Sequence, residues 1–290
     1  MVYSLSSVTL TNVEKVPLSF CCSGGIALNL NFVECPLSCN ACPWEANLSQ
    51  RSAELLNVRH VEIVEIIDRY SPDIVMLHGG EPYTVKGVDK LLEEIRGSYK
   101  GFIGIKANIF HAISAKERFN ELLHYSDLVL VEFVDVHFCQ INQQVVNDVN
   151  YFLHSIFSQH KGIEVIAVAT TRSCTENLIN VIIILKEFFK NSSTPLNWIF
   201  LEATSLNYKL GILDRFRELG IIAQAPLEDS VEIASTFCKA CRNPIILRQG
   251  GQLIRLSMDR NGVCKYCGYR YENFKYAKRI VRNPIEIQIL

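Results

Sequence analysis

The stretch Asp73-Ile-Val-Met-Leu-His-Gly-Gly-Glu-Pro82 joins an apolar run of strand length to a turn that holds two glycines and a proline. An apolar run bounded by turn residues is typical of a strand buried on both faces. The glycines would let the backbone approach a ligand closely, and the carboxylate of Glu81 can accept from an ammonium group. The simpler interpretation is an ordinary strand-to-helix turn without a ligand.

The same alternation of apolar and amphipathic segments continues on both sides of this stretch. The predicted strands are Ile26–Val33, Asp73–His78, Phe102–Asn108, Leu128–Val136, Ile163–Thr171 and Leu196–Thr204. The predicted helices are Ser49–Tyr70, Val85–Gly97, Ser114–Tyr125, Gln144–His160, Thr175–Lys190 and Leu206–Leu219. Such alternation indicates right-handed parallel units. We expect an α/β fold, a partial (β/α)6 barrel, while a doubly wound open sheet remains the alternative.

Length and composition set the broad class. The chain has 290 residues, 49% of them hydrophobic, and a formal net charge of −1. These values suit a large core and argue against a broad nucleic-acid or membrane surface. No apolar run approaches the ~20 residues of a membrane span. The start, Met-Val-Tyr-Ser, lacks the order of a signal peptide. Eleven cysteines, seven of them in metal-type spacing, favour a reducing cytoplasm over a disulfide scaffold.

A cysteine triplet follows the first predicted strand. Cys35, Cys39 and Cys42 are separated by three and then two residues. A 4Fe-4S cube takes four ligands, so three nearby thiolates leave one iron open to a ligand. A structural zinc knuckle is the alternative, with Cys21 or Cys22 as a fourth ligand. The Gly-Gly-Glu-Pro turn, at the end of the next strand, favours the cluster.

Polar residues recur where the other predicted strands end. In parallel barrels the chemistry lies at the carboxyl ends of the strands. Lys106, Asn108, Glu132 and Arg172 fall there. So do further polar residues, namely Asp135, His137, Thr170 and Glu202. For any one of them a solvated loop residue is the simpler interpretation. Asn29 and Asn31 should share one face of the first strand and need partners, which a ligand could supply.

A second cysteine group lies near the carboxyl terminus. Cys238 and Cys241 form one Cys-x-x-Cys knuckle, and Cys264 and Cys267 form another. Strand-like segments between them, Pro244–Arg248 and Gln252–Leu256, meet at Gly250-Gly251, which is a hairpin signal. Two knuckles and a hairpin predict a zinc ribbon with four thiolates. An auxiliary 4Fe-4S cluster is the alternative. We therefore divide the chain into a main domain at 1–230, a ribbon at 231–275 and a tail at 276–290.

Four cysteines remain outside these sites. Cys21, Cys22, Cys139 and Cys174 are predicted to be free thiols, which are usually inert when buried. Cys139 and Cys174 follow the fourth and fifth strands, at the expected mouth of the barrel. They are therefore candidates for a catalytic or radical-relay role.

With the triplet, the Gly-Gly-Glu-Pro turn and the six units, the chain resembles the radical S-adenosylmethionine superfamily, of the pyruvate formate-lyase activating enzyme type. It is most similar to the radical enzyme of the AmmeMemoRadiSam system, over nearly the whole chain. The shared short motifs are Tyr3-Ser-Leu, Glu14-Lys-Val-Pro-Leu18, Trp44-Glu45, Pro195-Leu196, Tyr208-Lys-Leu210 and the terminal ribbon.

The resemblance implies a cytoplasmic oxidoreductase that cleaves S-adenosylmethionine at a 4Fe-4S cluster to a 5′-deoxyadenosyl radical. The radical would abstract hydrogen from an unidentified substrate, for which a protein suits the open flank of a partial barrel. The resemblance also implies a ferredoxin- or flavodoxin-type reductant. By position, the triplet holds the cluster, Gly79, Gly80 and Glu81 hold the methionine amino group, and Asn108 and Glu132 contact the nucleoside or methionine part.

The chain departs from that pattern at three places. Ala41 stands where relatives place an aromatic residue, Val134 where activating enzymes have a lysine, and no histidine follows the sixth strand. The methionine carboxylate therefore needs another cation, and Arg172 and Lys106 are the candidates.

Two other kinds of function remain open. One is an iron–sulfur electron carrier with a fully ligated cluster. The other is a zinc-ribbon module that binds a partner without catalysis, with nucleic acid as a less favoured partner. The ribbon has basic residues at Lys239, Arg242, Arg248, Arg255, Arg260, Lys265 and Arg270, for which a solvated face is the simpler interpretation.

Overall fold

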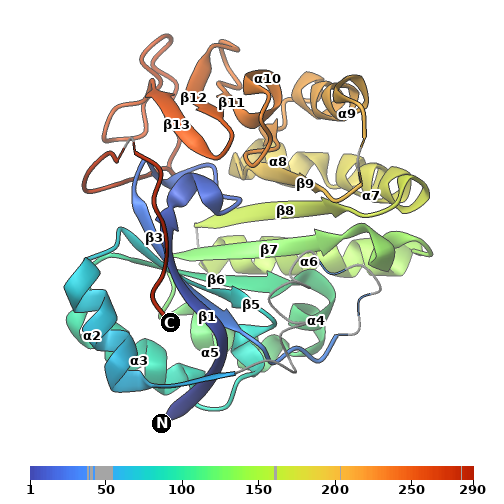
Figure 1. The fold of residues 1–290 in the computed structure, drawn as a ribbon. Helices are drawn as coiled ribbons and strands as arrows, with labels where there is room; N and C mark the ends of the chain where they lie inside the picture. Colours follow the sequence, from blue (N-terminus) through green and yellow to red (C-terminus); the bar gives the residue numbers. More distant parts are fainter. Residues whose placement is uncertain (38, 40–41, 43–54, 160–161, 203, 282) are drawn as a thin grey trace.

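The computed structural model describes residues 1–37, 39, 42, 55–159, 162–202, 204–281 and 283–290 (Figure 1). Most of its strands belong to one sheet, in the order β10-β9-β8-β7-β6-β5-β3-β1-β15, with β4 also paired to β1. The strands of this sheet are β1 (Val2–Asn12), β3 (Ile26–Phe32), β4 (Leu56–Arg59), β5 (Ile74–Gly79), β6 (Phe102–Asn108), β7 (Leu128–Val134), β8 (Ile163–Ala169), β9 (Leu196–Phe200), β10 (Ala223–Gln224) and β15 (Glu286–Gln288).

The central strands confirm the predicted α/β pattern. From β3 to β9 each strand pairs in parallel with the next one in the order β3-β5-β6-β7-β8-β9. This is chain order, without the reversal that defines a doubly wound sheet. The carboxyl ends of these strands therefore lie along one edge, which we call the carboxyl edge.

Helices follow most of the strands, as their amphipathic patterns predict. They are α2 (His60–Tyr70), α3 (Val88–Ser98), α4 (Ile109–Ser114), α5 (Lys116–Leu123), α6 (Gln143–Gln159), α7 (Arg172–Ile184), α8 (Lys186–Ser192), α9 (Leu206–Glu218) and α10 (Val231–Ala234). The prediction of one helix over Ser49–Tyr70 is wrong in its described part, because Leu56–Arg59 is a strand that pairs with β1. The predicted helix Thr175–Lys190 is split at Leu185, and α4, which precedes the predicted helix Ser114–Tyr125, was not predicted.

The amino-terminal strand and the end of the chain were not predicted as strands. β1 pairs antiparallel with β3 and, on its other side, with β4 and β15. This pairing also provides hydrogen-bond partners for the side chains of Asn29 and Asn31. Their amides donate to hydroxyls of β1, Asn29 to Thr11 at 3.0 Å and Asn31 to Ser7 at 2.9 Å. Hydroxyls of β1 therefore supply the partners of these two amide nitrogens, for which we had suggested a ligand, while the side-chain oxygen of Asn29 stays buried without a partner among the described residues.

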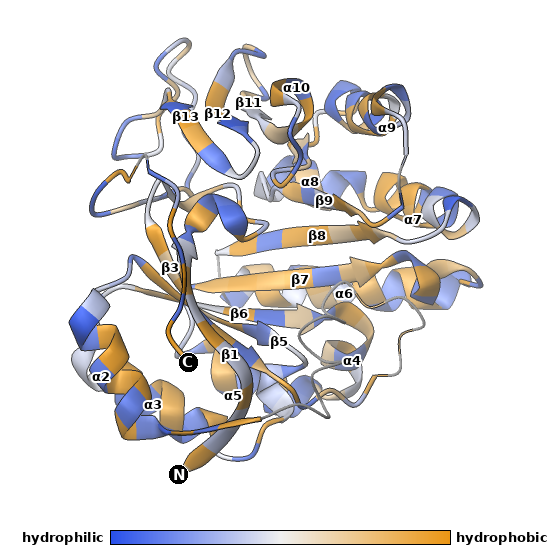
Figure 2. Cartoon of the chain, in the orientation of Figure 1, coloured by the Kyte–Doolittle hydropathy of each residue, from blue (hydrophilic) through white to orange (hydrophobic). Residues whose placement is uncertain are grey.

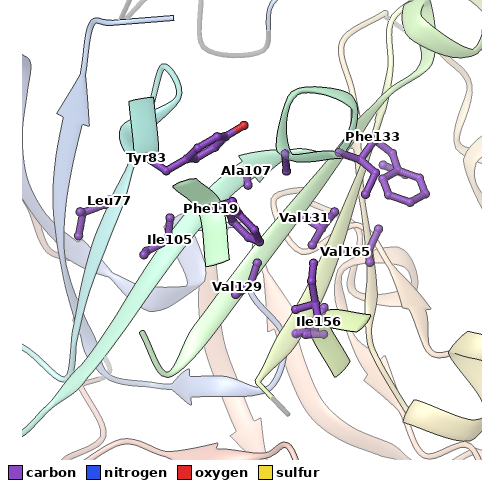
Figure 3. Close-up of a cluster of buried hydrophobic side chains, with 14 of the residues drawn as sticks. Leu77, Tyr83, Ile105, Ala107, Phe119, Val129, Val131, Phe133, Ile156 and Val165 are labelled. Atoms are coloured by element: carbon purple, nitrogen blue, oxygen red, sulfur yellow. The ribbon is translucent and has the colours of Figure 1, made fainter. Parts of the chain in front are cut away.

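The two faces of the sheet differ in what they bury. One face packs against the helices, as Ile105, Val131 and Val165 do against Phe119 of α5 and Ile156 of α6 (Figure 3). The other face buries a smaller cluster that includes Met76, Leu130 and Ile166. On β7 and β8, largely hydrophobic arrows are each interrupted by a hydrophilic band (Figure 2). These bands correspond to Glu132 and Glu164, which lie on the second face.

The carboxyl-terminal segment forms the predicted hairpin at the top of Figure 1. Its strands are β11 (Thr236–Phe237), β12 (Pro244–Gln249) and β13 (Gln252–Leu256). Gly250 and Gly251, between β12 and β13, both have positive φ, as the favoured two-residue hairpin turn requires. The hairpin shares a core with Phe20 and Ile222 of the main sheet region. A short strand after it, β14 (Lys275–Tyr276), pairs with β2 (Cys21–Ser23).

Candidate functional site at the carboxyl edge and the four-cysteine group

The Gly-Gly-Glu turn at the end of β5 is packed against the start of the triplet loop. The N–H of Gly80 donates to the carbonyl oxygen of Phe32 at 2.7 Å, and the N–H of Glu81 donates to that of Glu34 at 2.8 Å. Gly79 has φ +89°, and a Cβ on Gly80 would collide with the Glu34 carbonyl. We expected these glycines to admit a ligand; in the structure they admit the backbone that leads into Cys35.

Behind this turn lies a buried charge cluster. Glu81 accepts from the Lys106 ammonium at 2.7 Å and from the backbone N–H of Asn108 at 3.0 Å. Glu132 lies 3.4 Å from the same ammonium. Burial lowers the pKa of Lys106, but Glu132 and Glu81 outweigh burial, and the pKa lies above its usual value. With all three groups ionised, two carboxylates and one ammonium leave a net charge of −1, which favours a cationic ligand.

Asn108 joins this cluster to the next helix. Its side-chain oxygen caps α4 by accepting from the N–H of Phe110 at 3.1 Å. Its amide nitrogen, Nδ2, is buried and has no hydrogen-bond partner among the described residues. An unpartnered buried donor is costly, so this atom is suited to a ligand oxygen or ring nitrogen at the carboxyl edge.

The three triplet cysteines are half-buried, and Cys39 contacts a residue just after the end of β7. Its sulfur is 3.3 Å from Nε2 of His137, which follows β7. Burial raises the pKa of the Cys39 thiol to about 11, assisted by the neighbouring thiols of Cys42 and Cys35. Burial also lowers the pKa of His137, so this imidazole is neutral at physiological pH. The expectations for Ala41 and for Trp44-Glu45 lie outside the described residues.

The groups at this edge are of the kinds that an iron–sulfur cluster and an ammonium-bearing cofactor would need, namely thiols for the cluster and carboxylates for the ammonium group. The raised pKa of Cys39 disfavours its free thiolate, so a metal cation would be needed to hold this sulfur ionised. The net negative charge near Glu81 suits an ammonium group. Lys106 is engaged by two carboxylates, so it is a poorer partner for a methionine carboxylate than we expected.

Arg172 lies on another part of the edge, at the first position of α7. Its guanidinium is exposed and stacks 5.3 Å from the ring centroid of Tyr208 on α9. A small pocket there is lined also by Thr171, Glu202 and Thr204. Glu81, Lys106, Asn108 and Glu132 are thus brought together by direct contacts, whereas the described contacts of Arg172 are on the α9 side.

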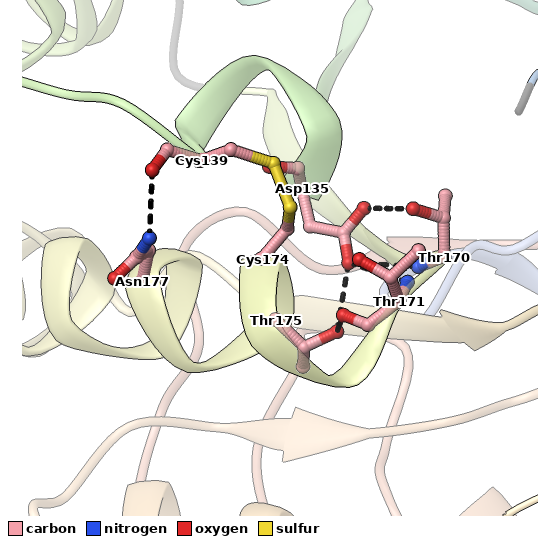
Figure 4. The surroundings of a disulfide bond; sticks show 7 residues. All are labelled: Asp135, Cys139, Thr170, Thr171, Cys174, Thr175 and Asn177. Atoms are coloured by element: carbon pink, nitrogen blue, oxygen red, sulfur yellow. Dashed lines mark hydrogen bonds between the residues drawn. A yellow bond between two sulfur atoms is a disulfide. The ribbon is translucent and has the colours of Figure 1, made fainter. Parts of the chain in front are cut away.

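The prediction of free thiols is correct for Cys21 and Cys22, which are buried. It is wrong for Cys139 and Cys174, which form a disulfide between the end of the turn Asp135–Phe138 and α7 (Figure 4). No local pattern indicates this bond, because the two cysteines are 35 residues apart and become neighbours only when β7 and β8 align. A bonded pair also lacks the S–H groups that a radical relay would need.

The second cysteine group is gathered into one site, as predicted. The sulfurs of Cys238, Cys241, Cys264 and Cys267 all lie within 4.8 Å of one another, and they are the one such group of metal-ligating atoms among the described residues. Cys238 and Cys267 are 3.7 Å apart, and Cys241 and Cys264 are 3.9 Å apart. A tetrahedron of sulfurs about 2.3 Å from one metal ion has edges of about 3.8 Å, so a single ion fits.

Two residues that the sequence did not single out support these sulfurs. The hydroxyl of Tyr271 donates to the sulfur of Cys238 at 3.2 Å. The amide of Asn243 approaches the sulfur of Cys241 at 3.5 Å, and hydrogen bonds from Asn243 lower the pKa of Cys241 to about 6. Such donors favour the thiolate that metal binding requires. Their proximity to the knuckles is the only sequence signal that could have found them.

Arg248, which we named among the basic residues of the ribbon, does not lie on its surface. It is fully buried, and its guanidinium donates to Ser19 O, Ser23 Oγ and Thr236 Oγ1. Glu14 lies 3.9 Å away. Arg248 therefore ties β12 to the amino-terminal segment instead of presenting a charge to a partner.

Comparison with protein-family models and with curated proteins finds no match to this chain. Among the described residues, every helix is too short or too polar to cross a membrane.

Proposed function

We propose that the chain is a radical S-adenosylmethionine enzyme whose substrate is unidentified. The observation that carries the proposal is the packing of the loop to Cys35 on the Gly-Gly-Glu turn, beside the buried Glu81–Lys106–Glu132 cluster. When bound, a 4Fe-4S cluster and S-adenosylmethionine would supply one-electron cleavage of a sulfonium, which side chains do not perform.

In this proposal the chain's own residues bind and orient. Cys35, Cys39 and Cys42 would hold the cluster and leave one iron open. The backbone of Gly79 and Gly80 and the carboxylate of Glu81 would receive the methionine amino group. Further contacts to the cofactor would come from Asn108, through its unpartnered Nδ2, and from Glu132.

The methionine carboxylate would be bound by Arg172 in preference to Lys106. Lys106 already contacts Glu81 and Glu132, whereas the guanidinium of Arg172 is exposed at the carboxyl edge. A guanidinium can bind a carboxylate with two parallel hydrogen bonds. Loss of one charge-assisted contact in Arg172→Ala should cost about 1.5–3 kcal/mol of binding free energy.

The finer fold follows from the same proposal. Strands in chain order, with helices packed on one face, are consistent with a partial (β/α)6 barrel. The polar residues at the carboxyl edge would then line its mouth, where a protein substrate and a ferredoxin- or flavodoxin-type reductant could approach.

The decisive experiment is an anaerobic turnover assay. Protein reconstituted with iron and sulfide is mixed with dithionite and S-adenosylmethionine, and 5′-deoxyadenosine is measured. We expect its formation, and a change in the spectrum of the reduced cluster when S-adenosylmethionine is added. Glu81→Gln should retain iron but lose both responses. A cluster that forms but ignores S-adenosylmethionine would identify an electron carrier, and a protein that binds only zinc would end the proposal.

For the ribbon we propose a structural zinc ion, supported by the sulfur separations of 3.7 and 3.9 Å. An auxiliary 4Fe-4S cube would hold its four ligating sulfurs farther apart, because each binds a different iron. Metal analysis of Cys39→Ala should still find about one zinc per chain. Iron bound by Cys238, Cys241, Cys264 and Cys267 would favour the cube.

A further inference from the structure

The disulfide of Cys139 and Cys174 lies at the carboxyl edge, close to the triplet. Cys139 follows the turn that carries His137, and His137 contacts the sulfur of Cys39. Cys174 lies in the first turn of α7. Both cysteines are half-buried, and their bond joins the segment after the turn Asp135–Phe138 to α7 (Figure 4).

The two segments that the disulfide joins are already held together by Asp135. Its carboxylate accepts from the backbone N–H of Thr170 at 2.8 Å and from the hydroxyl of Thr175 at 2.7 Å. It also accepts from the hydroxyl of Thr170 and from the N–H of Thr171. Asn177 adds a bond to the carbonyl oxygen of Cys139 at 3.0 Å. Opening the sulfur bond would therefore leave the two thiols side by side, ready to close again.

The rest of the chain favours reducing conditions. The other nine cysteines are not disulfide-bonded, and four of them must be thiolates to hold a metal ion in the ribbon. A reductant that keeps those sulfurs reduced also acts on a half-buried disulfide. Disulfides in reducing compartments are mostly transient, and serve catalysis or redox sensing.

We propose that Cys139 and Cys174 form a reversible two-electron redox site that exchanges with a dithiol–disulfide couple. A thiolate of the dithiol attacks Cys139, and the electron pair of the broken bond goes to the sulfur of Cys174. The first turn of α7 favours that thiolate, so Cys174 is the better leaving group. The second thiol of the reductant then releases Cys139. The chain gains two electrons and two protons, and the reductant leaves as a disulfide.

The test uses the full chain with zinc bound and needs neither iron nor S-adenosylmethionine, so its outcome is independent of the proposed enzyme activity. The protein is equilibrated in mixtures of reduced and oxidised dithiothreitol, and its free thiols are alkylated. Mass spectrometry then reads the peptides that carry Cys139 and Cys174. We expect the two to change together, with about a tenfold change in the open-to-closed ratio for each tenfold change in the dithiothreitol ratio.

Variants separate this site from a purely structural bond. Asn177→Ala should shift the equilibrium toward the open form, since it loosens Cys139 while the Asp135 contacts remain. Cys174→Ser should leave Cys139 trapped as a mixed disulfide with an oxidised monothiol such as glutathione disulfide. A bond that opens only when the protein unfolds would overturn the proposal, and so would a pair that stays reduced in every mixture.

Discussion

The two metal-type cysteine sites of this chain are built in opposite ways. The four ribbon sulfurs lie within 4.8 Å of one another, and Cys238 and Cys264 belong to a hydrophobic core. The triplet thiols lie on a loop, are all half-buried, and include a thiol whose pKa is raised to about 11. The ribbon sulfurs are thus brought together by the protein's own folding, whereas in our proposal the triplet site is completed by a bound cluster. Each of the following changes tests this difference.

The largest effect should follow loss of a ribbon ligand. Cys264→Ser should abolish zinc binding and destabilise the ribbon by several kcal/mol, because metal binding at a closed site contributes directly to folding. Metal analysis measures the loss of zinc. Thermal unfolding, with proteolysis of the ribbon as the probe, measures the loss of stability. Cys35→Ser in the triplet is the matched control and should keep the zinc. An unchanged unfolding temperature in Cys264→Ser would remove the contrast between the sites.

The next effect concerns the attachment of the ribbon. Arg248→Met should lower the free energy of unfolding by about 3 kcal/mol, because it leaves Glu14 buried without its nearby cation. Urea unfolding measures the change, and Arg255→Met, at an exposed position on β13, should be nearly neutral. Adding Glu14→Gln to Arg248→Met should restore part of the loss. If both single arginine variants behave alike, Arg248 does not anchor the ribbon.

Acid should destabilise the carboxyl edge through His78. Burial, with the nearby Lys106 charge, lowers the pKa of His78 to about 3, below the unfolded value of about 6.5. The folded state therefore binds fewer protons, and stability present above pH 6.5 is lost as the pH falls toward 3. Between pH 6 and 5 the loss should be about 1 kcal/mol. His78→Gln should flatten this dependence relative to the parent, whereas His154→Gln, at an exposed position on α6, should not. Equal slopes in both variants would rule out His78 as the cause.

The smallest effect on stability should come from the triplet itself. Cys39→Ala should eliminate iron binding while changing the free energy of unfolding of the metal-free protein by less than about 1 kcal/mol, since the side chain is half-buried on a loop. Iron analysis after anaerobic reconstitution and urea unfolding make the two measurements. A much larger loss of stability would mean that the triplet, like the ribbon, is part of the folded core.

Local patterns predicted most of the central sheet. Phe102–Asn108 was predicted with both ends correct, and the bounds of the other predicted strands in this sheet differ from those observed by one to four residues at an end. Buried parallel strands consist of continuous apolar runs, which are visible in the sequence. β1 and β4 were missed because their pattern is mixed, and pairing with one another decides their conformation. The helix predicted from Ser49 is wrong for the same reason, since Leu56–Arg59 pairs as a strand with β1.

The alternation of strands and helices, the Gly-Gly-Glu turn and the two cysteine spacings can be read from the sequence, because each depends on residues close together in the chain. Three contacts become visible only in the folded chain: Gly80 packs against the Glu34 carbonyl, Lys106 pairs with Glu81 and Glu132, and Cys139 bonds to Cys174. These contacts join residues that are distant in sequence. Their formation depends on the register of neighbouring strands and on the free energy of burying charge, and no local pattern records either.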